Sequence, residues 1–453
     1  MTNYFTSIPR THYSCLVRLG VPIVVGQLGT VVLGFADTLM IGHHSMQELA
    51  AASFINVMFT LVVIFSMGFS YGLTPVVGNH YGRDEHEAIG DVLRNSMAAN
   101  TALCALMLMV CTAFYMGLDY MGQPTELLPL MRPYLLVNIV SLPFMCWFNC
   151  FKQFFDGITH TRTPMYIIVG GNVLNIVGNA VLIYGLGPFP EMGLLGAGIS
   201  TLFSRVMMCV AFAVIFFSLR KYRVYRDACL KGSVKREMFV RLNALGWPVA
   251  LQLGMETASF SLAALFVGWI GTTALAAHQV SITVSQVLYL LHSGMASAVA
   301  VRVSFFHGQH DLVAVRQTAT AGFHIVLSIA LLLSVPIFLL RNHISYWFTS
   351  SAEVSVLVAQ TVIPLIIYQF GDTLQYTYAN ALRGISCVKP MMYGAFVAYF
   401  CVSLPLSWLM GIHLGYGLIG VWSGFPVGLT TAGVIYYVCF KRALAKEASV
   451  FNN

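Results

Sequence analysis

Two acidic residues lie inside stretches of the chain that are otherwise strongly apolar. Glu256 lies within LQLGMETASF and Asp372 within IIYQFGDTLQY. An ionised side chain at the centre of a lipid bilayer costs at least ~2.5–3.5 kcal/mol, so such residues need a reason to be there. Helical spacing places Gln252 on the face of Glu256, and it places Tyr368 and Tyr376 one turn before and after Asp372. Two neighbouring carboxylates can bind a small cation or share a proton.

The same acids also admit a structural interpretation. Neither has a Lys or Arg one helical turn away, so an ion pair would require Arg205 or Arg302 to approach from another helix. We expect two unpaired acids that form a site for Na⁺ or H⁺. Na⁺, as a hard cation, would take oxygen ligands from the carboxylates, a tyrosine and backbone carbonyls near Gly254 or Gly371. The sequence does not choose between the two ions and predicts no other metal site.

A second polar cluster is predicted in the first half of the chain. Gln27, Thr30 and Asp37 form a stripe along one helix, and Asn175 and Asn179 lie one turn apart on a later helix. These residues would bind a cation, a proton or a substrate. The alternatives are a helix-end role for Asp37 and hydrogen bonds between helices for the asparagines.

Other polar residues are candidates for lining a cavity, with helix packing as the equal alternative. They are Gln27, Thr30, Gln252, His278, Gln279 and Tyr376, with Ser281, Ser285 and Gln286 near His278. His278 and His292 have no convincing catalytic partner. There is no P-loop, G-x-S-x-G or H-E-x-x-H motif, and the ten cysteines include no C-x-x-C pair. The sequence therefore predicts neither an enzyme nor an ATP-driven pump, and no cofactor.

The elements that must position these residues are long apolar helices. Hydrophobic residues make up 58% of the 453 residues and charged residues only 9%, whereas soluble proteins are about 25% charged. This composition excludes a soluble enzyme and a disordered chain, and the apolar runs are too long and unbroken for a β-barrel. A spanning helix needs about 20 apolar residues. We predict twelve spans, near residues 14–38, 49–78, 95–117, 130–152, 164–186, 193–219, 242–270, 276–304, 317–340, 353–382, 390–411 and 416–440.

Basic residues are distributed unevenly between the two sides of these spans. Twenty of the 24 Lys and Arg residues lie on the side that carries both termini, eight of them in the segment 220–241. This bias predicts a multi-pass protein of the inner membrane with both termini in the cytoplasm. The basic 220–241 segment is expected to face anionic membrane lipid and not nucleic acid.

The chain repeats itself at an offset of 226 residues. Pro22 aligns with Pro248, Gly82 with Gly308 and Pro164 with Pro390, among other matches. Each copy holds six spans, so both copies insert with the same topology, which predicts a parallel repeat. We therefore predict an all-α integral membrane protein with two six-helix lobes, residues 1–219 and 242–453, joined by a basic cytoplasmic linker at 220–241.

Several motifs resemble those of the multidrug and toxin extrusion (MATE) family. They are Pro22-x14-Asp37-T-x-M-I-G in the first span and GLLGAGIST at 193–201. Glu256, the segment YQFGD at 368–372 and AHQ at 277–279 are similar to the NorM-like branch of that family. The resemblance extends over essentially the whole chain.

This resemblance implies a secondary active antiporter that exports organic, mostly cationic, compounds in exchange for Na⁺ or H⁺. It also implies that the protein is a monomer whose partners are small organic cations and membrane lipid. The implied cation site of the carboxyl-terminal lobe comprises Glu256, Asp372 and Tyr368. The implied amino-terminal site comprises Asp37, Asn175 and Asn179, although some relatives carry an acid where Asn179 stands.

Two alternatives come from other functional classes. A lipid-linked oligosaccharide flippase of the same superfamily would need Arg or Lys in its cleft to hold phosphate groups. Only Arg18, Arg205 and Arg302 are available for that role. An intramembrane enzyme would need a nucleophile–base pair or a metal set, which the sequence does not offer.

Overall fold

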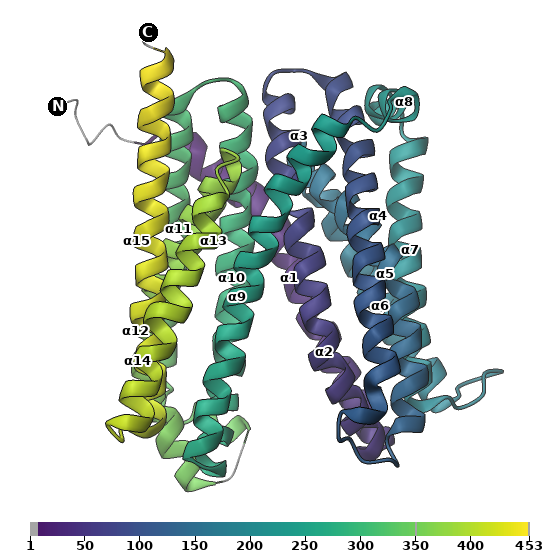
Figure 1. Cartoon of the computed structure of the whole chain (residues 1–453), viewed down its shortest axis with the longest axis vertical. Helices are drawn as coiled ribbons and strands as arrows, with labels where there is room; N and C mark the ends of the chain where they lie inside the picture. Colours follow the sequence, from purple (N-terminus) through teal and green to yellow (C-terminus); the bar gives the residue numbers. More distant parts are fainter. Residues whose placement is uncertain (1–7, 349–350, 452–453) are drawn as a thin grey trace. The chain divides into compact units, whose positions relative to one another are not determined.

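A computed structural model of the chain describes residues 8–348 and 351–451, and its regular structure there is entirely helical (Figure 1). Twelve of the described helical segments are long and apolar enough to cross a membrane, as predicted. Those of the first half are α1 (Arg10–His44), α2 with α3 (Met46–Ser70 and Leu73–Gly82), α4 (His86–Gly117), α5 (Leu128–Gly157), α6 (Arg162–Tyr184) and α7 (Gly193–Ser218). Those of the second half are α9 (Arg236–Ile270), α10 (Thr272–Gly308), α11 (Leu312–Leu339), α12 (Ala352–Gly384), the interrupted span Lys389–His413 and α15 (Gly417–Phe451). The chain is a multi-pass membrane protein.

The helix boundaries repeat between the two halves. The first span of each half contains 35 residues and the second contains 37. The turn after the second span also recurs, because Asp84 and His310, 226 positions apart, have φ angles of 58° and 59°. A residue with a left-handed backbone at this position allows the next backbone N–H to donate to a carbonyl of the last helical turn, and this hydrogen bond ends the helix. The repeat that a few Gly and Pro matches predict is thus present in the backbone.

The described helices form two compact units. The first-half unit is Val25–Ala250, and the second-half unit comprises Met1–Val24 together with Leu251–Asn453. Helices α1 and α9 therefore each contribute to both units, and each contains a proline, Pro22 or Pro248, close to the change. Proline removes a backbone hydrogen bond and favours a bend. The sequence predicted lobes at 1–219 and 242–453. In the structure, the described residues up to Val24 belong to the second-half unit, and residues 242–250 belong to the first-half unit. The ends of the predicted lobes, 1–7 and 452–453, lie outside the described residues.

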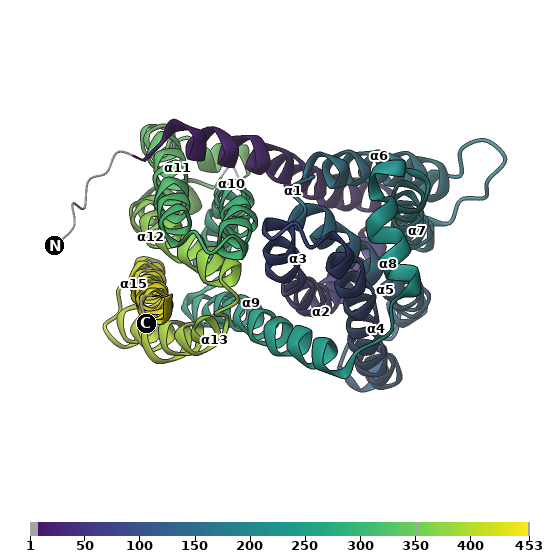
Figure 2. The ribbon, with the colours of Figure 1, turned by 90° about the horizontal axis from the view of Figure 1, so that it is seen from above.

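The basic segment 220–241 is ordered and packs on the first-half unit. It contains the short turn Arg220–Tyr222, helix α8 (Arg223–Lys231) and the start of α9. Helix α8 lies along the end of α4 (Figure 2). The Arg94 guanidinium of α4 donates to the backbone oxygens of Cys229 and Leu230, both at 3.0 Å. Gly90 of α4 allows the close approach, because a Cβ there would lie 2.3 Å from the Tyr225 carbonyl oxygen.

The eleventh span is interrupted by two π-helical segments. Helix α13 (Lys389–Ala395) continues as Phe396–Ser403, then α14 (Leu404–Trp408), then Leu409–His413. Each π turn inserts one extra residue, and this span has 25 residues where α6, its counterpart, has 23. Pro405 lacks a backbone N–H and accounts for part of the disruption. The first π segment carries Tyr399, which is fully buried.

Candidate functional site

Glu256 is held by three hydrogen-bond donors inside the second-half unit. Its carboxylate accepts from the Tyr376 hydroxyl at 2.6 Å, from Gln252 Nε2 at 3.0 Å and from Gln375 Nε2 at 3.4 Å. Gln252 lies one turn earlier on α9, and the other two donors come from α12. The predicted neighbours Gln252 and Tyr376 thus contact Glu256 directly and do not merely line a cavity. The side chain is only 7% exposed, so its charge depends on these donors.

Asp372 has a partner that its own helix does not reveal. Its Oδ2 lies 3.1 Å from Nδ1 of His292 on α10, and the two side chains are buried, at 2% and 0% exposure. The expectation that both acids are unpaired is therefore wrong for Asp372. Pattern reasoning missed His292 because it lies 80 residues away, and helical spacing relates residues only within one helix. The available signal was a second intramembrane ionisable residue in a neighbouring span.

Neither arginine considered as a structural partner forms an ion pair with these acids in the described residues. Arg302 lies over the rings of Phe305 and Phe306, at 4.6 and 4.2 Å. Arg205, which belongs to the first-half unit, donates to Ser141 and lies over another ring at 5.6 Å. The side chain that pairs with Asp372 in the site is therefore a histidine and not an arginine.

Gln375 connects the surroundings of the two acids. It lies one turn after Asp372 on α12, and its Nε2 donates both to Glu256 and to the Tyr399 hydroxyl. Tyr399 lies in the π-helical segment Phe396–Ser403, which no sequence pattern predicted. Gln375 Oε1 is buried without a hydrogen-bond partner. An orphaned acceptor beside a carboxylate suits a bound cation or proton, because burying a polar atom with no partner costs about 1–3 kcal/mol.

Tyr368 lies one turn before Asp372 on α12. It is 4% exposed, and its ring packs edge-on against Trp422 of α15, with ring centres 6.5 Å apart. The Trp422 Nε1 in turn donates to Nδ1 of His278 at 3.1 Å. The predicted residues Tyr368 and His278 are therefore in one buried network, whereas Gln279 is exposed.

The predicted first-half residues also come together. Asn179 Nδ2 donates to Asp37 Oδ1. The amide of Asn175 is oriented so that both of its polar atoms have complementary partners. In this orientation Asn175 donates to Asp37 at 3.2 Å and accepts from the Thr201 hydroxyl at 3.1 Å. Arg205 lies close enough to interact with the charge of Asp37. Asp37 thus accepts hydrogen bonds from two amides and lies near an arginine. The arrangement is compatible with both predictions, a binding site at Asp37 and hydrogen bonds between helices.

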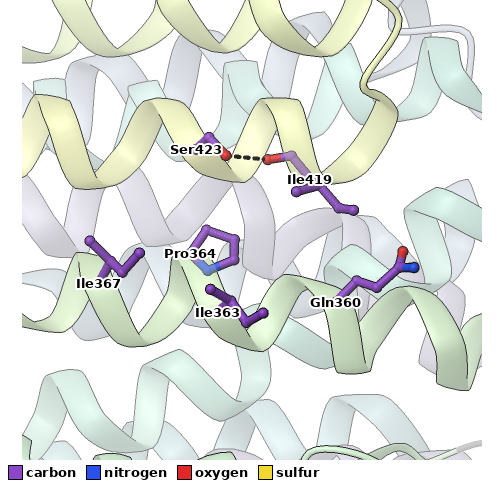
Figure 3. Close-up of a pocket in the computed structure, with 6 residues that line it drawn as sticks. All are labelled: Gln360, Ile363, Pro364, Ile367, Ile419 and Ser423. Carbon is purple, nitrogen blue, oxygen red and sulfur yellow. Dashed lines mark hydrogen bonds between the residues drawn. The ribbon is translucent and has the colours of Figure 1, made fainter.

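The remaining predicted residues lie outside these two clusters. Thr30 is exposed, and its hydroxyl donates to Gly26 O of its own helix at 3.2 Å. Gln27 is half-buried on the same helix. A groove of about 300 Å³ lies elsewhere, between α12 and α15 (Figure 3). Its lining is mainly aliphatic and includes no titratable side chain: Gln360, Ile363, Pro364, Ile367, Ile419 and Ser423.

Fold and site together define a class of protein. Twelve apolar spans in two repeated halves, with two buried acids inside one half, are the organisation of a secondary membrane transporter. Among the described residues there is no cluster of three His, Cys, Asp or Glu side chains that would hold a metal ion.

The chain belongs to the MatE family. The family model matches residues 22–181 and 248–409, one segment in each half. The probable multidrug resistance protein NorM of Photorhabdus laumondii subsp. laumondii is 26% identical over 94% of both chains. The corresponding protein of Bradyrhizobium diazoefficiens is 28% identical over 93% of this chain and 92% of that one.

Solved structures show the same fold. A mutant of the Vibrio cholerae MATE transporter VcmN has a TM-score of 0.87 and 18% sequence identity, over 96% of this chain and 98% of that one. Another MATE structure, in an outward-facing conformation, has a TM-score of 0.87 and 20% identity over 97% of both chains. The family resemblance drawn from the sequence motifs is confirmed.

Proposed function

We propose that the protein is a secondary active multidrug efflux antiporter that exports organic, mostly cationic, compounds in exchange for Na⁺ or H⁺. The observation that carries the proposal is the buried cluster in which Gln375 links the surroundings of Glu256 and Asp372. Membership of the MatE family and the names of the NorM relatives support the multidrug part. The protein moves its substrates and does not transform them chemically.

The coupling cation binds, in this proposal, at the second-half acids. Tyr376 and Gln252 fix the Glu256 carboxylate, and the Oε1 of Gln375, whose Nε2 donates to the same carboxylate, is buried without a partner. Na⁺ would find carboxylate, amide and phenol oxygens there, whereas H⁺ would be shared among the same oxygens. Tyr368 adds a phenol one turn before Asp372. The first-half cluster at Asp37 serves as a second site for a cation, a proton or a substrate.

Exchange follows from linkage between the two ligands. A cation that neutralises the acids removes the charge that attracts a cationic drug, so each ligand weakens the binding of the other. The factor is the same in both directions, because linkage is reciprocal. No cofactor takes part, and one chain suffices.

The proposed location is the inner membrane, with both termini in the cytoplasm. The distribution of basic residues along the sequence supports this orientation, because 20 of the 24 Lys and Arg residues fall in segments that the order of the spans assigns to the side of the termini. Membrane lipid is the surrounding partner, and nucleic acid has no role. The alternative, a flippase for lipid-linked oligosaccharides, is disfavoured because Arg205 and Arg302 are both packed against aromatic rings.

A flux measurement in liposomes tests the proposal. Purified protein is reconstituted, and a Na⁺ gradient or a pH gradient is applied in turn. We expect an organic cation such as ethidium to move against one of these gradients and to stimulate the flux of that ion. Drug movement without ion flux, or transport of a lipid-linked oligosaccharide instead, would overturn the proposal.

A further inference from the structure

Polar residues of α10 and α12 face one another in register within the second-half unit. The two helices lie side by side (Figure 2). Ser281 hydrogen-bonds Thr361 at 2.8 Å and His292 hydrogen-bonds Asp372 at 3.1 Å, and both pairs are 80 residues apart. A constant offset means that the helices run in the same direction and keep one register over about three turns. The polar stripe on α10 consists of His278, Ser281, Ser285, Tyr289 and His292, and we call it the α10 stripe.

The α10 stripe meets further polar groups on α12. Ser285 lies within hydrogen-bonding reach of the Tyr368 hydroxyl. Tyr289 packs edge-on against Tyr376, with ring centres 5.2 Å apart, and Tyr376 donates to Glu256. The stripe therefore leads, side chain by side chain, to both acids of the candidate cation site.

Several buried polar atoms along this route have no partner in the protein. They are Nε2 of His278, Nε2 of His292 and both amide atoms of Gln369. All three side chains are at most 2% exposed. An unpaired polar atom in a protein interior costs about 1–3 kcal/mol, so native structures satisfy such atoms with ordered water.

The alternative explanation is that the stripe only fastens two helices together. Ser and Thr side chains commonly do so between membrane helices, and the Ser281–Thr361 pair fits that role. The unpaired atoms do not fit it, because fastening brings donors and acceptors together in pairs. Gln369 in particular contacts no hydrogen-bond partner although it lies next to Tyr368 in the core of the unit.

The stripe has the length and position of an access route. It extends over 15 residues of α10, from His278 to His292, and these are about 21 Å apart at a rise of 1.5 Å per residue. His278 is six residues from the first residue of α10, Thr272, which lies about 9 Å away along the helix. In the proposed orientation Thr272 is at the outer surface. The route therefore connects outer water with Asp372.

We propose that a file of water molecules between α10 and α12 carries the coupling cation between the outer surface and Asp372, within the second-half unit and apart from the path of the drug. This inference rests on the antiport function proposed above. It assigns His278, Ser281, Thr361 and Gln369 as positioning residues of the water file. None of them contacts Glu256 or Asp372 in a described hydrogen bond.

Hydroxyl-radical footprinting of the wild-type protein tests the water file directly. X-ray radiolysis of bound water oxidises the side chains beside it, and mass spectrometry locates the products. Tyr368 and Tyr436 are a matched pair, because both are buried tyrosines of the second-half unit and Tyr436 donates to Met391 O, away from the stripe. We expect Tyr368 to oxidise several-fold faster than Tyr436. Equal rates would overturn the proposal.

A pair of variants tests the function of the file. In Ser281→Ala/Thr361→Val the two facing hydroxyls become methyl groups, which do not hold water. Thr373→Val is the control, because its hydroxyl, also buried on α12, donates only to Phe370 O of its own helix. We expect the double variant to slow cation-driven export several-fold with drug affinity unchanged, and the control to do neither.

The two measurements separate this inference from the proposed function. Footprinting does not require transport, so fast oxidation of Tyr368 supports the water file even if no coupled flux is found. Coupled flux at the wild-type rate in the double variant would contradict the file while leaving antiport intact. Running the flux under a Na⁺ gradient and under a pH gradient identifies which cation the file carries.

Discussion

Equivalent positions in the two halves carry different chemistry on the same helical frame. His292 corresponds to Ser66 at the offset of 226 residues, and Asp372 corresponds to Met145 at the offset of 227 that the matching helix ends Gly157 and Gly384 set for α5 and α12. Neither Ser66 nor Met145 is ionisable, so the contact between His292 and Asp372 has no charged counterpart in the first half. The repeat thus preserves the helical frame, while the His–Asp pair occurs in one half only.

The reverse comparison gives the same result. Asp37 of the first-half cluster corresponds to Ala263. Each half therefore has one polar cluster, at a place where its counterpart is less polar. The two halves therefore share the arrangement of helices, and each half has its own set of polar residues on that arrangement.

The largest effect is expected from neutralising the second-half acids. Glu256→Gln and Asp372→Asn should each abolish coupled export, because a neutral amide cannot exchange a cation. Met145→Leu, at the position equivalent to Asp372, should leave export near the wild-type level, because it keeps the apolar volume. Drug resistance of cells at equal expression measures all three. Wild-type resistance with either acid removed would break the comparison.

An intermediate effect is expected from His292. The variant His292→Ala leaves Asp372 buried without its partner, and leaving a buried polar group without its partner costs about 1–3 kcal/mol, and more for a charged group. Ser66→Ala, at the equivalent position, removes only a neutral hydroxyl and leaves no ionisable group without a partner, so it should cost at most about 1 kcal/mol. Thermal unfolding in detergent should therefore show a markedly larger fall in Tm for His292→Ala.

A double variant sharpens that test. If the pair interacts, His292→Ala combined with Asp372→Asn should be more stable than His292→Ala alone, because no unpaired carboxylate remains. Strictly additive losses of stability would show that the imidazole and the carboxylate do not depend on each other.

The smallest effect concerns a turn that both halves share. Thr159 and Ser386, in equivalent loops, have left-handed backbones with φ of 64° and 61°. Replacing either with glycine relieves a strain of about 1–2 kcal/mol, offset in part by the larger backbone entropy of glycine. Tm should rise slightly in both variants, and more for the β-branched Thr159. A fall in Tm at one site only would show that the two loops are not equivalent.

The sequence predicted what depends on local pattern. Apolar length gave the twelve spans, matched Gly and Pro residues gave the repeat, and helical spacing brought Gln252 to Glu256. It did not give His292 or Tyr399. The first contacts Asp372 across two helices that share a register, and the second is turned inward by a π-helical insertion. Both depend on packing between distant segments, which spacing along one helix does not encode.

The most direct test of coupling is an equilibrium drug titration on the purified protein. Fluorescence polarisation of an organic cation is followed at several Na⁺ concentrations and several pH values. The account predicts that saturating Na⁺, or a drop in pH, weakens drug binding roughly 5–150-fold, the usual size of such linkage. Asp372→Asn should flatten this dependence, whereas Asp37→Asn should retain more of it. Drug affinity that is independent of both ions in the wild-type protein would contradict the account, even if the protein exports drugs.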